Sequence, residues 1–266
     1  LCIAVGGILG LCGAVMQGLF RNPLADPGII GVSGGAALGA ALAIVLLAPL
    51  GQQLQSLLGL GLLPLLAFLG GALTTTLVYL LGTREGGTSV TVMLLAGVAI
   101  TALSGAVIGL LTYLADDQML RNLSLWQMGS LAAGKPVDVG LALATLVALL
   151  WLFMRDANPL NALLLGEGEA RHLGVNVQCL KRRLILLTAA GVGVAVAVAG
   201  MIGFVGLVVP HLVRLLAGPN HVRLLPLSAL LGAALLLGAD MLARTLLAPA
   251  EMPVGIITAL LGAPFF

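Results

Sequence analysis

Long, continuous apolar segments alternate with short polar segments along this chain. The apolar segments cover residues 1–20, 29–48, 62–82, 90–114, 138–155, 184–204, 225–246 and 253–266. A helix needs about 20 apolar residues to cross a bilayer, whereas a barrel strand would alternate over about ten residues. The segments therefore predict eight full or partial transmembrane helices. A further segment, 207–216, is too short to cross alone and predicts a half-helix or re-entrant helix.

The composition supports an all-α, polytopic membrane protein. The chain has 266 residues, of which 60% are hydrophobic and 8% charged, with 12 basic and 10 acidic side chains. Soluble domains carry about 25% charged residues, so this chain lacks the polar groups to cover a water-exposed surface. The net charge of +2 does not indicate nucleic-acid binding. The glycines at 31, 35 and 39, and at 6 and 10, predict close helix packing.

Basic residues are distributed unevenly between alternate loops. One set of loops holds Arg21, Arg84, Arg155, Arg171, Lys181, Arg182, Arg183, Arg214 and Arg223, and the other holds Arg121 and Lys135, with Arg244 near a helix end. Cytoplasmic loops are enriched in Lys and Arg. The pattern predicts that loops 155–183 and 214–224 are cytoplasmic, provided that 207–216 brings the chain back to that side. Loops near 49–61, 115–137 and 247–252 are then expected to face outward.

Two sequence patterns that could indicate an enzyme lack residues that the corresponding sites require. Residues 129–135 fit the glycine and lysine spacing of a phosphate-binding loop, but Pro136 follows where such a loop needs Ser or Thr. No strand is predicted before this segment. The loop that contains it is expected on the outer side of the membrane, away from cytoplasmic ATP. His172, His211 and His221 have no spacing typical of a metal site, which needs three or four converging ligands. We therefore expect neither an ATPase site nor a bound metal or cofactor in this chain.

Charged residues within the predicted spans are few. Asp240 and Arg244 are four residues apart on one helical face and are expected to pair. Ion-coupled carriers place ionisable groups in the membrane interior, and the spans have no evident acidic relay. This pattern argues against a secondary transporter, which stays a weaker alternative.

The loop 155–183 is too long to be a simple connection. Asn158-Pro159 is expected to stop a helix, and the residues from Leu163 to Gly174 predict one or two short amphipathic helices on the cytoplasmic surface. They are interpreted either as a docking surface for a cytoplasmic partner or as charged residues beside the membrane. The turn from Arg214 to Pro226 could contribute to the same surface.

Four stretches resemble one family of membrane proteins. They run from Gly13 to Gly35, from Gly203 to His211, from Ala239 to Arg244 and from Glu251 to Gly255. Together they are similar to the signature of the iron-chelate, haem and cobalamin ABC importer permeases, the FecCD/BtuC-like type II importers. The resemblance assigns structural motif roles to Gln17, Asn22, Pro23, Asp26, Pro27, Gly31, Ser33, Gly34, Pro210, His211, Asp240, Pro253 and Gly255.

The resemblance implies a complete transport assembly in the bacterial inner membrane. Two permease chains of ten helices each, expected to be a homodimer, would lie in the lipid bilayer with two cytoplasmic ATPases that use ATP and Mg²⁺. A periplasmic substrate-binding protein would deliver the cargo, and Arg244 resembles an arginine that docks it. The present chain would be one permease domain over residues 1–266, truncated at both ends, with eight to nine of the ten helices.

The resemblance also makes residues 156–183 the cytoplasmic coupling loop. The residues expected to couple to the ATPase are Gly166, Glu167, Glu169, Ala170, Arg171, Leu173, Gly174, Arg214 and His221. The expected cargo is an iron complex, either haem or a ferric siderophore, with haem favoured and cobalamin as the alternative. A membrane scaffold without transport activity is a further competing class, but such a scaffold would not need the docking loop.

Overall fold

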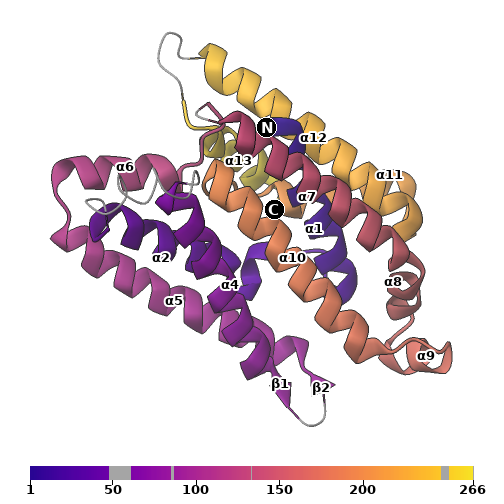
Figure 1. The fold of residues 1–266 in the computed structure, drawn as a ribbon. Coiled ribbons are helices and arrows are strands. Elements are labelled where there is room, and N and C mark those ends of the chain that lie inside the picture. The colour runs from indigo at the N-terminus through magenta and orange to yellow at the C-terminus, as the bar shows by residue number, and fades with distance from the viewer. Residues whose placement is uncertain (48–60, 85–86, 133, 247–251, 266) are drawn as a thin grey trace. The chain divides into compact units, whose positions relative to one another are not determined.

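The computed structural model describes residues 1–266 except 48–60, 85–86, 133, 247–251 and 266 (Figure 1). Its helices are α1 (Cys2–Phe20), α2 (Val32–Val45), α4 (Leu62–Gly82), α5 (Val90–Leu114), α6 (Asp117–Gln127), α7 (Pro136–Arg155), α8 (Ala157–Leu164), α9 (Glu167–His172), α10 (Val177–Ala199), α11 (Val205–Ala217), α12 (His221–Leu246) and α13 (Val254–Gly262). Short 3-10 helices cover Pro27–Ile30 and Ala263–Phe265. A two-stranded antiparallel hairpin pairs β1 (Thr83–Arg84) with β2 (Gly87–Thr88), and Thr83 lies opposite Thr88.

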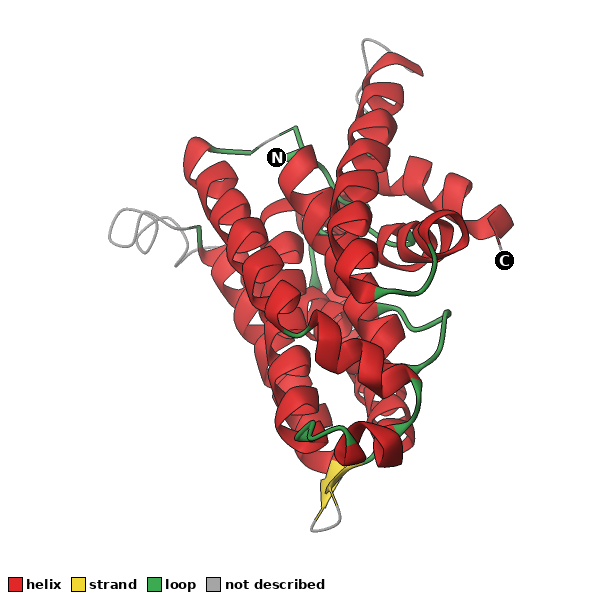
Figure 2. Ribbon diagram, turned by 90° about the vertical axis from the view of Figure 1, so that its right-hand side faces the viewer, coloured by secondary structure: helices red, strands yellow, loops and turns green. Residues whose placement is uncertain are grey.

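The helical fold class predicted from the apolar segments is confirmed (Figure 2). Six helices in the described part of the chain are long and apolar enough to span a membrane, namely α1, α4, α5, α7, α10 and α12. The helices α2, α11 and α13 are apolar but shorter. Helix α11 matches the short segment expected at 207–216 to within a few residues.

The structure adds detail to two of the expected loops. The segment 115–137, expected as a loop between spans, contains the short helix α6, whose first turn is capped by Asp116 Oδ1 accepting from the Met119 N–H at 2.7 Å. Helix α10 begins at Val177 rather than near 184, so Lys181 and Arg183 lie in its first two turns. Asn176 Oδ1 accepts from the Cys179 N–H at 3.1 Å and satisfies a donor of that first turn. A hydropathy pattern misses such a start because the first turns are polar.

The chain divides into two compact units, each described here by itself. The first comprises residues 1–27, 131–192 and 202–266 and is built around α1, which is buried along nearly its whole length. Helix α1 contacts α7, α8, α11 and α12. A Cβ on Gly6 or Gly10 would collide with the backbone oxygens of Gly232 and Ser228 in α12. The close packing expected from the first glycine pair is therefore confirmed.

The second unit comprises residues 28–130 and 193–201. Helix α2 contacts α4, α5 and α6, and a Cβ on Gly35 or Gly39 would collide with the backbone of α4. Thr74 Oγ1 donates to the Gly31 carbonyl oxygen at 2.8 Å and fixes α4 to the start of α2. Gly31 itself has φ 85°, which glycine adopts readily and other residues rarely do. The second set of glycines also serves helix packing.

Candidate functional site

Helix α8 is held against the first unit by one apolar face. Ala157, Leu160 and Leu163 are buried, and α8 contacts α1, α7 and α12. Helix α7 ends at Arg155, as the predicted stop requires, but Pro159 lies in the first turn of α8 rather than outside a helix. A proline costs little there because the first N–H groups of a helix have no intrahelical acceptor.

Helix α9 is a short, largely exposed helix that lies between two glycines with positive φ angles. Gly166 has φ 120° and Gly174 has φ 82°, conformations that residues with a Cβ rarely adopt. Ala170 is buried, so one face of the helix is anchored. The exposed side chains form what we call the α9 surface, which consists of Leu165, Glu169, Arg171, His172 and Leu173.

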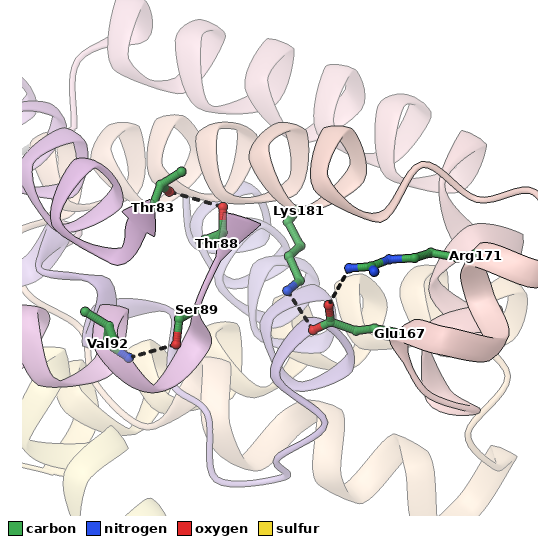
Figure 3. Close-up of polar contacts among 7 residues, drawn as sticks. All are labelled: Thr83, Thr88, Ser89, Val92, Glu167, Arg171 and Lys181. Carbon is green, nitrogen blue, oxygen red and sulfur yellow. Dashed lines mark hydrogen bonds and ion pairs between the residues drawn. The ribbon is translucent and has the colours of Figure 1, made fainter. Parts of the chain in front are cut away.

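Ion pairs tie this surface to the start of α10 (Figure 3). Lys181 Nζ donates to Glu167 Oε1 at 2.6 Å, and Arg171 Nη2 lies 3.8 Å from Glu167 Oε2. The Lys181 side chain is only 3% exposed, so its charge depends on polar partners within the protein. Near the base of α8, Arg183 donates to Asp156. The expectation of one or two short helices in this loop is thus confirmed, and both are linked to a long apolar helix.

A polar contact joins α8 to the start of α12. Asn161 Oδ1 accepts from the His221 backbone N–H at 2.8 Å and lies 2.9 Å from His221 Nδ1. Asn161 Nδ2 donates to Asn220 Oδ1 at 3.0 Å. The His221 side chain is 1% exposed and its ring lies against Gly18, where a Cβ would collide with Nε2. This corrects the expectation that His221 adds to the docking surface, because a buried ring positions α8 rather than touching a partner.

Several motif residues from distant parts of the chain line one open cavity of about 370 Å³. Part of its lining comes from the end of α1, the residues after it and α11: Gln17, Arg21, Asn22, Pro23, His211 and Arg214. Leu164 of α8, Leu215 and Pro219 complete the lining. Arg214, expected in the coupling set, therefore belongs to this cavity and not to the α9 surface.

Other motif residues have packing or capping positions. Pro27 and Pro210 are buried, and a Cβ on Gly206 would lie 3.0 Å from Pro27 Cδ. A Cβ on Gly34 would lie 3.2 Å from Thr101 Cα, and Ser33 is half-buried in the first turn of α2. The remaining positions are Asp26, which is half-buried, Pro253, which precedes α13, and Gly255 in its first turn. Glu251 lies outside the described residues.

The expected pair on α12 is present. Arg244 Nε donates to Asp240 Oδ2 at 2.8 Å, four residues apart along the helix. Asp240 is largely buried, whereas the Arg244 side chain is 45% exposed. Arg244 can thus satisfy an internal carboxylate and still present part of its guanidinium group to a partner.

In the part of the chain that the structure describes, no group of three or more His, Cys, Asp or Glu residues lies close enough together to hold a metal ion. The segment before α7 caps that helix, because the Lys135 N–H donates to Asp138 Oδ2 at 3.0 Å. Lys135 therefore lies at a helix start and does not follow a strand.

Sequence comparisons agree on one protein family. The model of the FecCD transport family matches residues 1–266. The hemin transport system permease protein HmuU of Yersinia pestis is 50% identical over 269 residues, which cover 100% of this chain and 78% of that protein. The cobalamin import system permease protein BtuC of Halobacterium salinarum is 45% identical, covering 98% of this chain and 68% of its own length. The vitamin B12 import system permease BtuC of Vibrio cholerae is 43% identical, covering 98% of this chain and 76% of its own length.

Solved structures agree with these sequence matches. A metal-chelate type ABC transporter in an inward-facing conformation superimposes with a TM-score of 0.88 at 36% identity, covering 100% of this chain and 82% of that chain. PsaBC from Streptococcus pneumoniae, in complex with Fab, has a TM-score of 0.70 at 20% identity, with 99% of this chain and 86% of that chain covered. The second likeness concerns the fold alone.

Proposed function

We propose that this chain, which belongs to the FecCD transport family and is a permease subunit of an ABC importer, carries haem across the membrane. The observation that supports haem is the higher identity to a hemin permease than to the cobalamin and vitamin B12 permeases. Cobalamin is the second candidate, because those relatives also match nearly the whole chain. A ferric siderophore is the third candidate, since a metal-chelate type transporter has the same fold.

In this proposal the α9 surface receives the ATP-binding subunits. It is exposed, it carries both charged and apolar side chains, and it lies in the loop that the basic residues predict to be cytoplasmic. The buried faces of α8 and α9 hold the α9 surface in a fixed position on the protein. Its links through Asp156, Asn161 and Glu167 reach α10 and α12. Movement of the ATPases is thereby passed to long apolar helices.

The opposite side of the bilayer would meet the substrate-binding protein. Arg244 lies in the last turn of α12, where it keeps an exposed guanidinium edge beside Asp240. A second copy of this chain would complete the translocation path in the inner membrane. Nucleotide binding then shifts the bundle between two packings, because only a differential affinity for two states moves their equilibrium.

Uptake measurements test the proposed cargo. The chain is assembled with its own ATPase and substrate-binding protein in vesicles, and uptake of haem, a ferric siderophore and cobalamin is measured with ATP and with a non-hydrolysable analogue. The proposal expects ATP-dependent uptake of haem at least tenfold above the other two cargoes. Equal or higher uptake of cobalamin would assign the importer to that cargo instead. The variant Arg244→Ala, compared with Thr245→Ala, tests docking of the binding protein by its affinity for the assembled complex.

A further inference from the structure

The open cavity at the end of α1 is lined by positive charge that no carboxylate in its lining neutralises. Arg21 and Arg214 both line it, and none of its lining residues is a carboxylate. Three other arginines of the first unit pair with carboxylates: Arg171 with Glu167, Arg183 with Asp156 and Arg244 with Asp240. Within the described residues, Arg21 and Arg214 form no such pair. The cavity therefore presents two guanidinium groups whose donors are free to bind an anion.

The backbone holds these groups in place. Arg21 ends α1 in a left-handed conformation, with φ 49° and ψ 37°, and its N–H donates to the carbonyl oxygens of Gln17 and Gly18. This conformation is uncommon for a residue with a side chain, and it sets the direction in which Arg21 leaves the helix. Its Nη1 lies 3.8 Å from the position that a Cβ would take on Gly166. Arg214 reaches the same cavity from the last turn of α11.

A buried polar atom adds a second, independent indication of a ligand. Gln17 lines the cavity and is 2% exposed. Its Nε2 donates to the Leu207 carbonyl oxygen at 3.0 Å, whereas its Oε1 has no hydrogen-bond donor among the described residues. Leaving such an acceptor unsatisfied costs about 1–3 kcal/mol in general. A ligand that brings a hydroxyl or ammonium donor together with an anion would satisfy both the glutamine and the arginines.

Apolar side chains mark one rim of the cavity. Leu215, in its lining, is 70% exposed, and the neighbouring Leu216 is 85% exposed. Exposed leucines directly beside a basic residue are typical of the boundary between acyl chains and head groups, and basic pockets between membrane helices bind lipid phosphates. The charge pattern of the sequence places both arginines on the cytoplasmic side, where anionic lipids are enriched.

We propose that this cavity binds the phosphate group of a phospholipid, with Arg21 and Arg214 on the phosphate and Gln17 accepting from a head-group donor. This proposal does not depend on which cargo is carried. Free inorganic phosphate offers the same anion without acyl chains, and the exposed leucines favour the lipid. Because Leu164 of α8 also lines the cavity, a bound head group would contact the base of the coupling loop.

Native mass spectrometry of the purified full chain in detergent tests this site. Retention of phosphatidylglycerol is compared with retention of diacylglycerol, which has the same chains and no phosphate. The double variant Arg21→Gln/Arg214→Gln is compared with Arg182→Gln/Arg223→Gln, which removes the same charge from exposed positions outside the cavity. We expect the cavity variant to weaken phosphatidylglycerol binding by tenfold or more, and the control variant by less than about twofold, since charge-assisted hydrogen bonds to phosphate are lost in one case only.

Competition with inorganic phosphate identifies the source of the anion. If phosphate does not displace the lipid, a phospholipid is the ligand; if phosphate alone binds with the same dependence on Arg21 and Arg214, the phosphate site stands with a free anion as its ligand. Equal retention of diacylglycerol, or equal losses in both double variants, would overturn the proposal. So would a cavity variant that keeps its phosphatidylglycerol but loses its ATP-binding subunit, because the cavity would then be a protein contact.

Discussion

The Lys181 ammonium donates to the Glu167 carboxylate at 2.6 Å, although the two residues are 14 positions apart and lie in different helices. Lys181 belongs to the long apolar helix α10, and Glu167 is the first residue of the short helix α9. Their contact fixes the orientation of α9 relative to the start of α10.

Replacing Glu167 and replacing Lys181 should destabilise the protein to different extents. Glu167→Gln leaves a 3% exposed ammonium without its carboxylate, whereas Lys181→Met leaves a carboxylate that is 35% exposed and can be hydrated. Breaking a buried pair from one side costs about 3–5 kcal/mol, and less when the remaining charge reaches water. We expect Glu167→Gln to lower the Tm in detergent more than Lys181→Met. The reverse order would mean that the pair contributes little to holding α9.

Asn161 should be a positioning residue for α8. Asn161→Ala removes the acceptor for two donors of His221, which is 1% exposed, and should cost about 1–3 kcal/mol of stability. Asn158→Ala is the matched control, because Asn158 is exposed on the same helix. We expect the first variant to lower the Tm and to reduce ATP-driven uptake with unchanged basal hydrolysis by the ATPase. Similar results for both variants would contradict this role.

Glycine at position 13 should be required by packing. A Cβ there would collide with the backbone oxygen of Gly206, which no rotamer change relieves. Gly140→Ala is the control in the same unit, since nothing lies within 4 Å of a Cβ at that position. Gly13→Ala should reduce the amount of folded protein in the membrane, measured by fluorescence-detected size-exclusion chromatography. Gly140→Ala should leave it unchanged or gain about 0.5–1 kcal/mol from helix propensity. Normal yield and Tm for Gly13→Ala would refute the packing argument.

The carboxyl group of Asp156 should make stability depend on pH. Burial raises the pKa of Asp156 above its ordinary value, and the neighbouring Arg183 acts in the opposite direction. The folded state therefore binds this proton more tightly than the unfolded chain, and its contribution to stability is lost as pH rises through the raised pKa. Relative to Asp156→Asn, which does not titrate, the wild-type Tm should fall as the pH rises above the ordinary aspartate pKa of about 4. A difference that is constant with pH would contradict the direction of this shift.

The apolar segments were sufficient to predict the helical fold, because bilayer thickness constrains helix length. They could not predict α6 or the early start of α10, where polar residues such as Asp116 and Asn176 cap amphipathic turns. Capping depends on single side chains and leaves no trace in average hydropathy. The pair Asp240–Arg244 was predictable because four residues bring side chains together on any helix.

The short helices between residues 155 and 183 were predicted, but their contacts with the rest of the chain were not. Gly166 and Gly174, which frame α9, have positive φ angles, and nothing in the sequence specified the contacts that hold the helix between them. The sequence could not identify the hydrogen-bond partners of Asn161, Asp156 and Gln17, since those partners lie 27 to 190 positions away. The same limit explains why His221 was expected on the surface. A polar residue in a turn gives no sign that a glycine such as Gly18 leaves room to bury it.

The most direct test of the account is coupled transport by a variant altered only on the α9 surface. Glu169→Lys/Leu173→Asp changes two exposed side chains without touching Gly166 or Gly174. The same exchanges on α6, Asp117→Lys/Leu125→Asp, serve as the control. ATP-driven uptake is measured in vesicles that hold equal amounts of permease and ATPase. The account predicts at least a tenfold loss of uptake for the α9 variant, with normal membrane insertion. Unchanged uptake would contradict the assignment of α8 and α9 as the coupling element.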